Sequence, residues 1–229
     1  MVQLSNRLKE VASFVKKNAV LADIGSDHAY LPTYLVKEKQ ILKAIAGEVV
    51  KGPYESAVRN VRKENVEDYI TVRLANGLKA IEEQDSVDTV TIAGMGGTLI
   101  AKILEEGTAH LTTVQRIIAQ PNIHAEAIRQ WAVANKWHII AEKILKEDDK
   151  IYEIIVLERG ISSYDSAELL LGPFLIKEKN DVFQEKWQHE MAEWQRILQL
   201  ITQAKETADT IEKRAILTEQ IEIVEGVLE

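Results

Sequence analysis

Residues 20–35, VLADIGSDHAYLPTYL, decide the fold. A short run of small apolar residues ends in Asp23 and Gly25, and a segment with helical apolar spacing starts near His28 and Ala29. This order predicts a strand, a tight turn and a helix, which is how nucleotide-binding folds hold a cofactor.

The composition limits the class of protein. The chain has 229 residues, enough for one domain of ordinary size and an appendage. It contains no run of eighteen apolar residues, and its N-terminus lacks the apolar core of a signal peptide, so we expect no membrane span. The absence of cysteine excludes disulfides and thiolate zinc sites, and the five histidines lack paired metal spacing. We therefore expect a cytoplasmic protein without a bound metal.

Charge is distributed unevenly along the chain, whose net charge is −8. Residues 1–63 carry 11 Lys and Arg against 6 Asp and Glu, whereas the remaining residues carry 17 against 30. A basic end on an acidic protein is typical of a nucleic-acid partner, and a solvated helix face over residues 3–17 is the alternative interpretation.

Strand and helix patterns alternate after this opening helix. Short runs rich in Val, Ile and Ala predict parallel strands buried on both faces, at 19–25, 43–49, 70–75, 87–94 and 114–120. Two further strand patterns, 137–147 and 150–159, are separated by a hairpin-length connection, so one of them must run antiparallel. A parallel sheet that ends in an antiparallel hairpin is the Rossmann-like layout of class I methyltransferases. We place this domain at residues 1–160.

Residues 161–229 show no strand pattern and are assigned to a second, helical domain. Phe183, Trp187, Met191, Trp194, Leu198 and Ile201 recur at steps of four and three, and a second helix is expected over 207–227. The two helices predict an antiparallel, coiled-coil-like hairpin. We interpret the aromatic stripe as its seam rather than as a base-stacking surface.

The first turn indicates which cofactor the fold holds. Dinucleotide sites place glycine where this chain has Asp27, because backbone amides must approach a pyrophosphate there. A carboxylate repels a pyrophosphate but attracts the ammonium and sulfonium groups of S-adenosylmethionine. Asp23, Gly25 and Asp27 are therefore predicted to bind this donor, with a helix N-cap as the alternative role of Asp27.

The ends of the next strands supply further candidates. Glu48 stands where an acid binds ribose hydroxyls, and Val49 could flank the adenine. Asn76 and Gly77 form a turn that faces the adenine if the fold is right. In the glycine turn after the fourth strand, close ligand approach and tight strand–helix packing are both open, and Ala93, Gly94 and Met95 are assigned to the cofactor. Asn122 is interpreted as a helix N-cap beside the methyl donor.

Six motifs in register give the chain a family resemblance: LSNRLKEVASFV, ADIGSDHAYLP, IAGE…KGP, VRLANGL, TIAGMGG and QPNIHAEAIRQW. Over residues 4–160 the chain closely resembles the bacterial tRNA adenine-N(1)-methyltransferases that modify adenosine 22. One departure is Asn76, which stands where such enzymes commonly carry Asp. The resemblance implies methyl transfer from S-adenosylmethionine to tRNA, with Asp27, Asn122 and His28 as the polar groups nearest the methyl.

Because the C-terminal region is acidic, we expect the RNA contacts to lie in the basic N-terminal third of the chain. We predict that phosphates are contacted there by Arg7, Lys9, Lys16, Lys17, Arg59 and Arg62. We expect a monomer or weak homodimer. The alternatives are a class I methyltransferase that acts on rRNA or a small molecule, and a non-catalytic module that binds S-adenosylmethionine.

Overall fold

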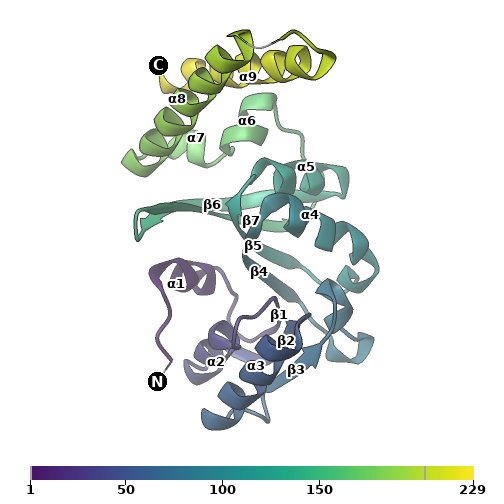
Figure 1. Cartoon of the computed structure of the whole chain (residues 1–229). Coiled ribbons are helices and arrows are strands. Elements are labelled where there is room, and N and C mark those ends of the chain that lie inside the picture. The colour runs from purple at the N-terminus through teal and green to yellow at the C-terminus, as the bar shows by residue number, and fades with distance from the viewer. Residues whose placement is uncertain (1, 204) are drawn as a thin grey trace. The chain divides into compact units, whose positions relative to one another are not determined.

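The computed structural model describes residues 2–203 and 205–229. Contacts divide the chain into two compact units, the first ending at Ser162 and the second beginning at Ser163. The first unit is an α/β domain built on one sheet, and the second is helical (Figure 1).

A seven-stranded sheet forms the first unit, in the order β3-β2-β1-β4-β5-β7-β6. β7 runs opposite to the other six strands and is antiparallel to both β5 and β6, as the short connection before it predicted. The mostly parallel sheet with a terminal antiparallel hairpin is confirmed. The strands are β1 (Ala19–Ile24), β2 (Ile41–Glu48), β3 (Ile70–Leu74), β4 (Thr89–Gly96), β5 (Arg116–Ile123), β6 (Trp137–Glu147) and β7 (Lys150–Arg159).

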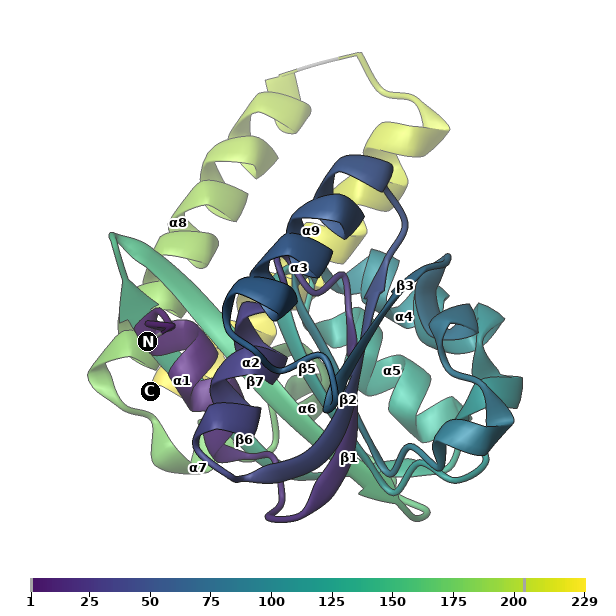
Figure 2. The ribbon, with the colours of Figure 1, turned by 90° about the horizontal axis from the view of Figure 1, so that it is seen from below.

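Helices cover both faces of the sheet, which is why its central strands are apolar on both sides. Figure 2 shows α1, α2 and α3 on one face and α4 and α5 on the other. These helices are α1 (Asn6–Ser13), α2 (Tyr30–Lys37), α3 (Lys51–Lys63), α4 (Gly97–Glu106) and α5 (Glu126–Ala134). Short 3-10 turns η1 (Gly77–Ala80), η2 (Glu83–Asp85) and η3 (Thr108–Leu111) complete this unit.

The opening helix α1 is shorter than the predicted 3–17. Ser5 caps its first turn by accepting a hydrogen bond from the Leu8 amide. At the other end, the Gln40 amide group donates to the carbonyls of Ala12 and Val15, which satisfies acceptors that a longer helix would use itself. Lys16 and Lys17 therefore lie beyond the helix.

A buried ion cluster ties the terminal hairpin to α5. Arg129 of α5 is fully buried and pairs with Glu142 of β6 at 2.7 Å and with Glu153 of β7 at 2.6 Å. The single guanidinium is the cationic partner of both carboxylates, so removal of the arginine would leave uncompensated negative charge in the core.

The strand order reverses direction between β1 and β4, because the chain first winds outward to β3 and then returns to β4. The carboxyl ends of these two strands form the crevice where open α/β sheets bind ligands. Gly25 follows β1 and the glycine turn ends β4, so both sequence motifs meet at this switch point.

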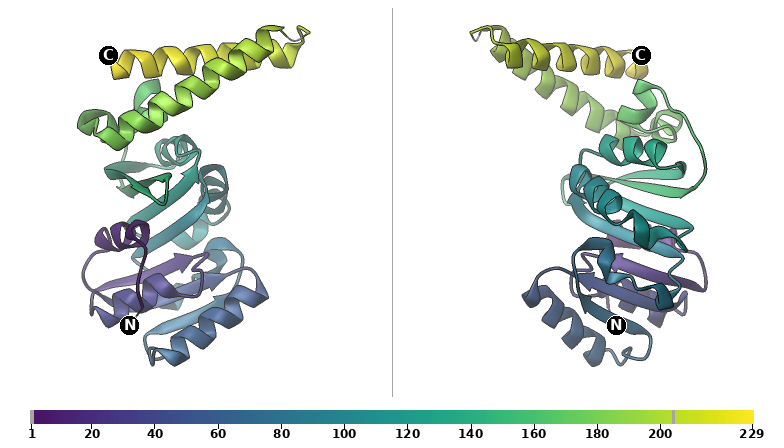
Figure 3. Two further views of the ribbon diagram at one scale, coloured as in Figure 1. Left: turned by 60° about the vertical axis from the view of Figure 1, so that its left-hand side comes forward. Right: turned by 90° about the vertical axis from the view of Figure 1, so that its right-hand side faces the viewer.

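The second unit contains α6 (Ser166–Leu171), α7 (Leu175–Glu178), α8 (Asp181–Gln203) and α9 (Ala208–Leu228). Figure 3 shows α8 and α9 as the two arms of a hairpin, and α6 packs on α9. The apolar stripe of α8 is fully buried only near its start, at Phe183 and Trp187. Its later members, Met191, Trp194, Leu198 and Ile201, are half-buried. Among the described residues, no helix has both the length and the apolarity that a bilayer crossing requires.

Gly97, the first residue of α4, offers a test of strand–helix packing. A Cβ atom there would lie 1.9 Å from the backbone carbonyl oxygen of His124, the residue that directly follows β5. We expect Gly97→Ala to lower the free energy of unfolding by about 1–3 kcal/mol in urea denaturation. Gly96→Ala is the control, since a Cβ there meets only Ile123 at 3.9 Å. Equal losses in the two variants would contradict this packing role.

Candidate active site

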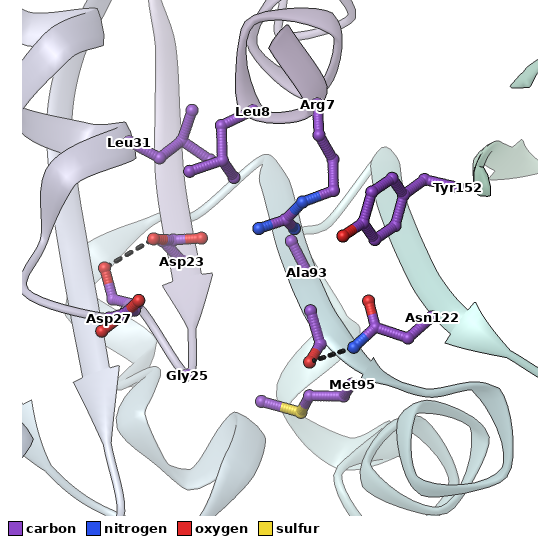
Figure 4. Close-up of a pocket in the computed structure, with 12 residues that line it drawn as sticks. Arg7, Leu8, Asp23, Gly25, Asp27, Leu31, Ala93, Met95, Asn122 and Tyr152 are labelled. Carbon is purple, nitrogen blue, oxygen red and sulfur yellow. Dashed lines mark hydrogen bonds between the residues drawn. The ribbon is translucent and has the colours of Figure 1, made fainter. Parts of the chain in front are cut away.

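Two neighbouring cavities open at the switch point, with volumes of about 340 and 280 Å³. They share Gly25 and Met95, which form the boundary between them. Figure 4 shows the larger cavity, with side chains that come from β1, β4, β5, β7 and α1. Its polar lining residues are Arg7, Asp23, Ser26, Asp27, Asn122 and Tyr152.

Asp23 is the buried anion of the larger cavity. Its carboxylate accepts hydrogen bonds from Ser26 at 2.5 Å and Thr91 at 2.6 Å, and only 4% of the residue is exposed. Burial raises the pKa of Asp23 to about 6, the two hydroxyl donors oppose the rise, and the nearby charges of Glu48 and Asp27 add to it. A cation in the cavity would therefore be attracted to this group.

Arg7 supplies the positive charge of the same cavity. Its guanidinium donates to the Gln120 side-chain oxygen and lies 5.2 Å from the centre of the Tyr152 ring. In the described part of the chain these contacts are with neutral groups, and no carboxylate pairs with this guanidinium. Figure 4 shows Arg7 and Asp23 facing the same space. The sequence assigned Arg7 to tRNA phosphates, but the structure places it inside the cavity.

The turn after β1 differs from its predicted form. The helix α2 starts at Tyr30, not at His28, and its N-cap position is Ala29 without a side-chain cap. Asp27 therefore does not cap the helix, and its side chain is 85% exposed at the cavity rim. The physical reason is that Asp27, His28 and Ala29 all adopt left-handed backbone conformations, with φ of 39°, 62° and 56°.

Glu48 holds this turn in place. Its carboxylate accepts a hydrogen bond from the Asp27 amide at 2.7 Å, and only 6% of the residue is exposed. Burial raises the pKa of Glu48, while the Asp27 amide opposes the rise. Glu48 does not line either cavity, so its predicted contact with ribose hydroxyls stays a prediction.

The smaller cavity collects the other predicted cofactor residues. Val49, Asn76 and Gly77 line it together with the apolar side chains of Leu99 and Ile103. Lys102 and Glu106 of α4 add charges that the sequence did not indicate. The structure thus brings the ends of β2 and β3 together beside α4, while the adenine-binding role of these residues stays a prediction.

Asn122 is not a helix N-cap, because β5 continues through Ile123 and α5 begins only at Glu126. Its amide group donates to the Gly94 carbonyl at 2.8 Å (Figure 4). Gln120 accepts from the Gly94 amide at 3.0 Å and donates to the Asn122 side chain at 3.3 Å. The two amides therefore fix the glycine turn that, with Ala93 and Met95, lines the cavity.

Gly25 is favoured by its left-handed φ of 69°, and its backbone lies close to the end of the Met95 side chain. A Cβ atom at this position would lie 2.1 Å from the terminal methyl carbon of Met95. The Met95 side chain therefore lies across the Gly25 backbone, at the point where the two cavities meet.

The basic residues predicted to contact RNA are separated by the fold. Lys9, Lys17, Arg59 and Arg62 are exposed, whereas Lys16 forms an ion pair with Glu158 at 2.8 Å. The two arginines lie on α3, with Arg62 in its last turn and Arg59 about one turn earlier. His28 is half-buried and lines neither cavity.

Sequence reasoning missed four residues of the larger cavity: Leu8, Ser26, Leu31 and Tyr152. Leu8 and Leu31 belong to apolar stripes whose partner surface is not encoded in their spacing. Tyr152 lies near the start of β7, and only the observed strand order brings it beside β5. Within the described residues, no group of three acidic, histidine or cysteine side chains is arranged to hold a metal ion.

Comparison with known proteins places this site in context. The sequence pattern of the family described as tRNA (adenine(22)-N(1))-methyltransferase matches residues 21–226. A Bacillus subtilis protein with that same description is 46% identical over 234 residues, which cover 100% of this chain and 98% of the relative.

Solved structures agree with this similarity. The B. subtilis m1A22 tRNA methyltransferase superposes with a TM-score of 0.95 at 45% identity, covering 100% of both chains. A Streptococcus pneumoniae protein whose structure was solved in complex with S-adenosyl-L-methionine gives a TM-score of 0.90 at 47% identity. That match covers 99% of this chain and 100% of the other.

The raised pKa of Asp23 predicts a pH-dependent loss of stability. The unfolded chain ionises this carboxyl near pH 4 and the folded chain near pH 6, so the folded state binds the extra proton between these values. Stability from this group is therefore lost as pH rises through 6. The test is urea unfolding of both proteins without ligands. The free energy of unfolding of Asp23→Asn minus that of the unsubstituted protein should increase by about 1 kcal/mol from pH 5 to pH 7.

The control for this experiment is Asp68→Asn, which alters an exposed carboxyl. Its difference from the unsubstituted protein should stay constant over the same pH range. A constant difference for Asp23→Asn as well would contradict the buried, destabilised carboxylate.

Proposed function

The chain belongs to the tRNA (adenine(22)-N(1))-methyltransferase family, and we propose that it transfers a methyl group from S-adenosylmethionine to ring nitrogen 1 of adenosine 22 in tRNA. The observation that carries the proposal is the charge pattern of the larger cavity. One buried carboxylate, Asp23, and one guanidinium with neutral partners, Arg7, face the same space. This pair is complementary to the ammonium and carboxylate of an α-amino acid.

The donor fits the two cavities end to end. Asp23 and Arg7 would bind the methionyl end, while Val49, Asn76 and Gly77 would enclose the adenosine end in the smaller cavity. Gly25, whose left-handed conformation side chains rarely adopt, lies between the two ends. The acidic turn opposes a pyrophosphate at this position, which disfavours a dinucleotide.

When bound, S-adenosylmethionine supplies an activated methyl group on a sulfonium centre. The ring nitrogen of adenine would bond to the methyl carbon through its own in-plane lone pair while the bond from that carbon to sulfur breaks, leaving S-adenosylhomocysteine. No residue has to remove a proton first. The target base must leave its stack to reach the cavity. Asn122 and Gln120 hold the glycine turn open for that base through their hydrogen bonds with Gly94.

Methylation at this nitrogen leaves the adenine positively charged. We assign Asp27 to this charge, because its exposed carboxylate lies on the rim of the larger cavity without a capping role. His28 lies 3.5 Å from that carboxylate and orients it rather than acting as a base. Asp27 and Asn122 are the candidates that would touch the substrate.

We assign different roles to the two units of the chain. Residues 1–160 form the catalytic domain, whose exposed Lys9, Lys17, Arg59 and Arg62 bind tRNA phosphates. Residues 161–229, with 7 basic and 14 acidic residues, orient the tRNA by shape. The chain acts as a monomer or weak homodimer in the cytoplasm, where its substrate is found.

Methyl transfer to an unmodified tRNA transcript tests the function. We expect label from S-adenosylmethionine to enter the transcript and to map to adenosine 22 by a stop in reverse transcription. A transcript with guanosine at position 22 should accept none. Transfer to rRNA or a small molecule alone, or binding of the donor without transfer, would support the rival functions instead.

The role of Arg7 can be measured without tRNA. We expect Arg7→Met to raise the Kd for S-adenosylmethionine at least about tenfold in calorimetry, because a charge-assisted hydrogen bond is lost from a partly desolvated site. The matched control, Lys43→Met, removes the same charge from an exposed position on β2 and should leave the Kd unchanged. Unchanged donor affinity in Arg7→Met would remove this residue from the donor site.

A further inference from the structure

We propose that the rings of His28 and Tyr30 form a stacking platform for the nucleobase next to the adenosine that is methylated. This inference rests on the proposed function, since it needs a tRNA at the larger cavity. It assigns a contact to two side chains that line neither cavity.

The two rings are stacked and open to solvent. Their centroids are 5.3 Å apart with an angle of 25° between the ring planes. The His28 side chain is 42% exposed and Tyr30 is 39% exposed, so aromatic surface remains available outside the pair. Base stacking on exposed aromatic rings is how proteins hold unpaired nucleotides.

The platform is held rigidly. The Asn60 side chain of α3 donates to the His28 carbonyl at 2.9 Å, and Glu48 accepts from the Asp27 amide at 2.7 Å. Ala29, which lies between the two ring residues in the chain, is fully buried and adopts a left-handed backbone conformation. A strained backbone fixed from both sides is typical of a functional surface, because strain persists only where the surroundings enforce it.

The position of the rings favours a neighbouring base over the target base. Asp27 and Leu31, which flank the two ring residues in sequence, line the larger cavity, whereas the rings do not. A nucleotide that enters this cavity therefore brings its neighbour to the rim, beside the rings. The target base itself would contact the cavity walls.

Charge indicates that a base, not a phosphate, meets the rings. The Asp27 carboxylate lies 3.5 Å from His28 and would repel a phosphate at the platform. Phosphates are instead attracted to α3, which also holds the turn through Asn60 and carries exposed Arg59, Arg62 and Lys63. The rings and the basic helix thus offer adjacent contacts to a base and to its backbone.

The test compares Tyr30→Leu, Tyr30→Phe and Tyr30→Trp with the unsubstituted protein. We expect Tyr30→Leu to raise the Kd for unmodified tRNA about 5- to 100-fold and the two aromatic variants to stay within about threefold. The slope of log Kd against log salt should not change in Tyr30→Leu, because stacking releases no counterions. By contrast, Arg59→Gln should lower that slope by about one.

Two controls separate this contact from a structural role. Tyr69→Leu removes a tyrosine that is 52% exposed and directly precedes β3, an edge strand of the sheet. This substitution should leave tRNA affinity unchanged. The Kd for S-adenosylmethionine should be the same in all Tyr30 variants. If Tyr30→Leu does not fold, equal tRNA affinity of Tyr30→Trp and Tyr30→Phe with the unsubstituted protein is still expected, and a large loss in Tyr30→Phe would overturn the platform.

Other outcomes also overturn it. Unchanged tRNA affinity in Tyr30→Leu, with methyl transfer by the unsubstituted protein intact, would reject the platform and leave the proposed function standing. A loss confined to kcat would assign the ring to the target adenine instead. If the unsubstituted protein transfers no methyl group to tRNA, the proposed function fails, and the stacking proposal fails with it.

Discussion

The buried carboxylate of Asp23 is the constraint on which the site depends. It joins β1 to β4 through Thr91 and fixes the first turn through Ser26, so the two central strands of the sheet meet at one anion. Burial makes this charge costly, since it raises the pKa of the carboxyl to about 6. A protein that keeps an anion in such a position gains most from a ligand that brings a cation to it.

The turn that follows is shaped by two contacts from outside its own segment. Glu48 at the end of β2 and Asn60 on α3 hold Asp27 and His28 in left-handed conformations. Because both contacts come from the second βα unit, the cavity rim depends on the packing of β1 against β2. The carboxylate of Asp27 is left exposed at the rim instead of being used as a helix cap.

The sequence predicted the sheet well because each strand is a short apolar run with its own boundaries, and the connection before Lys150 is too short for a parallel crossover. Prediction from the sequence failed where residues outside a helix or strand determine its boundary or its position. Gln40 ends α1 early, and three left-handed residues delay α2 to Tyr30. Asn122 has the residue type of an N-cap, but β5 extends past it to pair with β4. From the sequence, Arg7 is interpreted as a surface cation, because no spacing rule predicts where a helix that precedes the first strand will pack.

In the function that we propose, the two ligands approach through different surfaces, and the same charges account for this. A donor with ammonium and sulfonium groups is attracted to the carboxylates of Asp23 and Asp27, and its single carboxylate finds Arg7. A polyanion is repelled by those acids and is attracted to the exposed basic residues on α1, just beyond α1 and on α3, which are Lys9, Lys17, Arg59 and Arg62. The target base alone, being uncharged, can leave that basic surface and enter the acidic cavity. Methylation then makes it a cation at the place where the protein already holds negative charge.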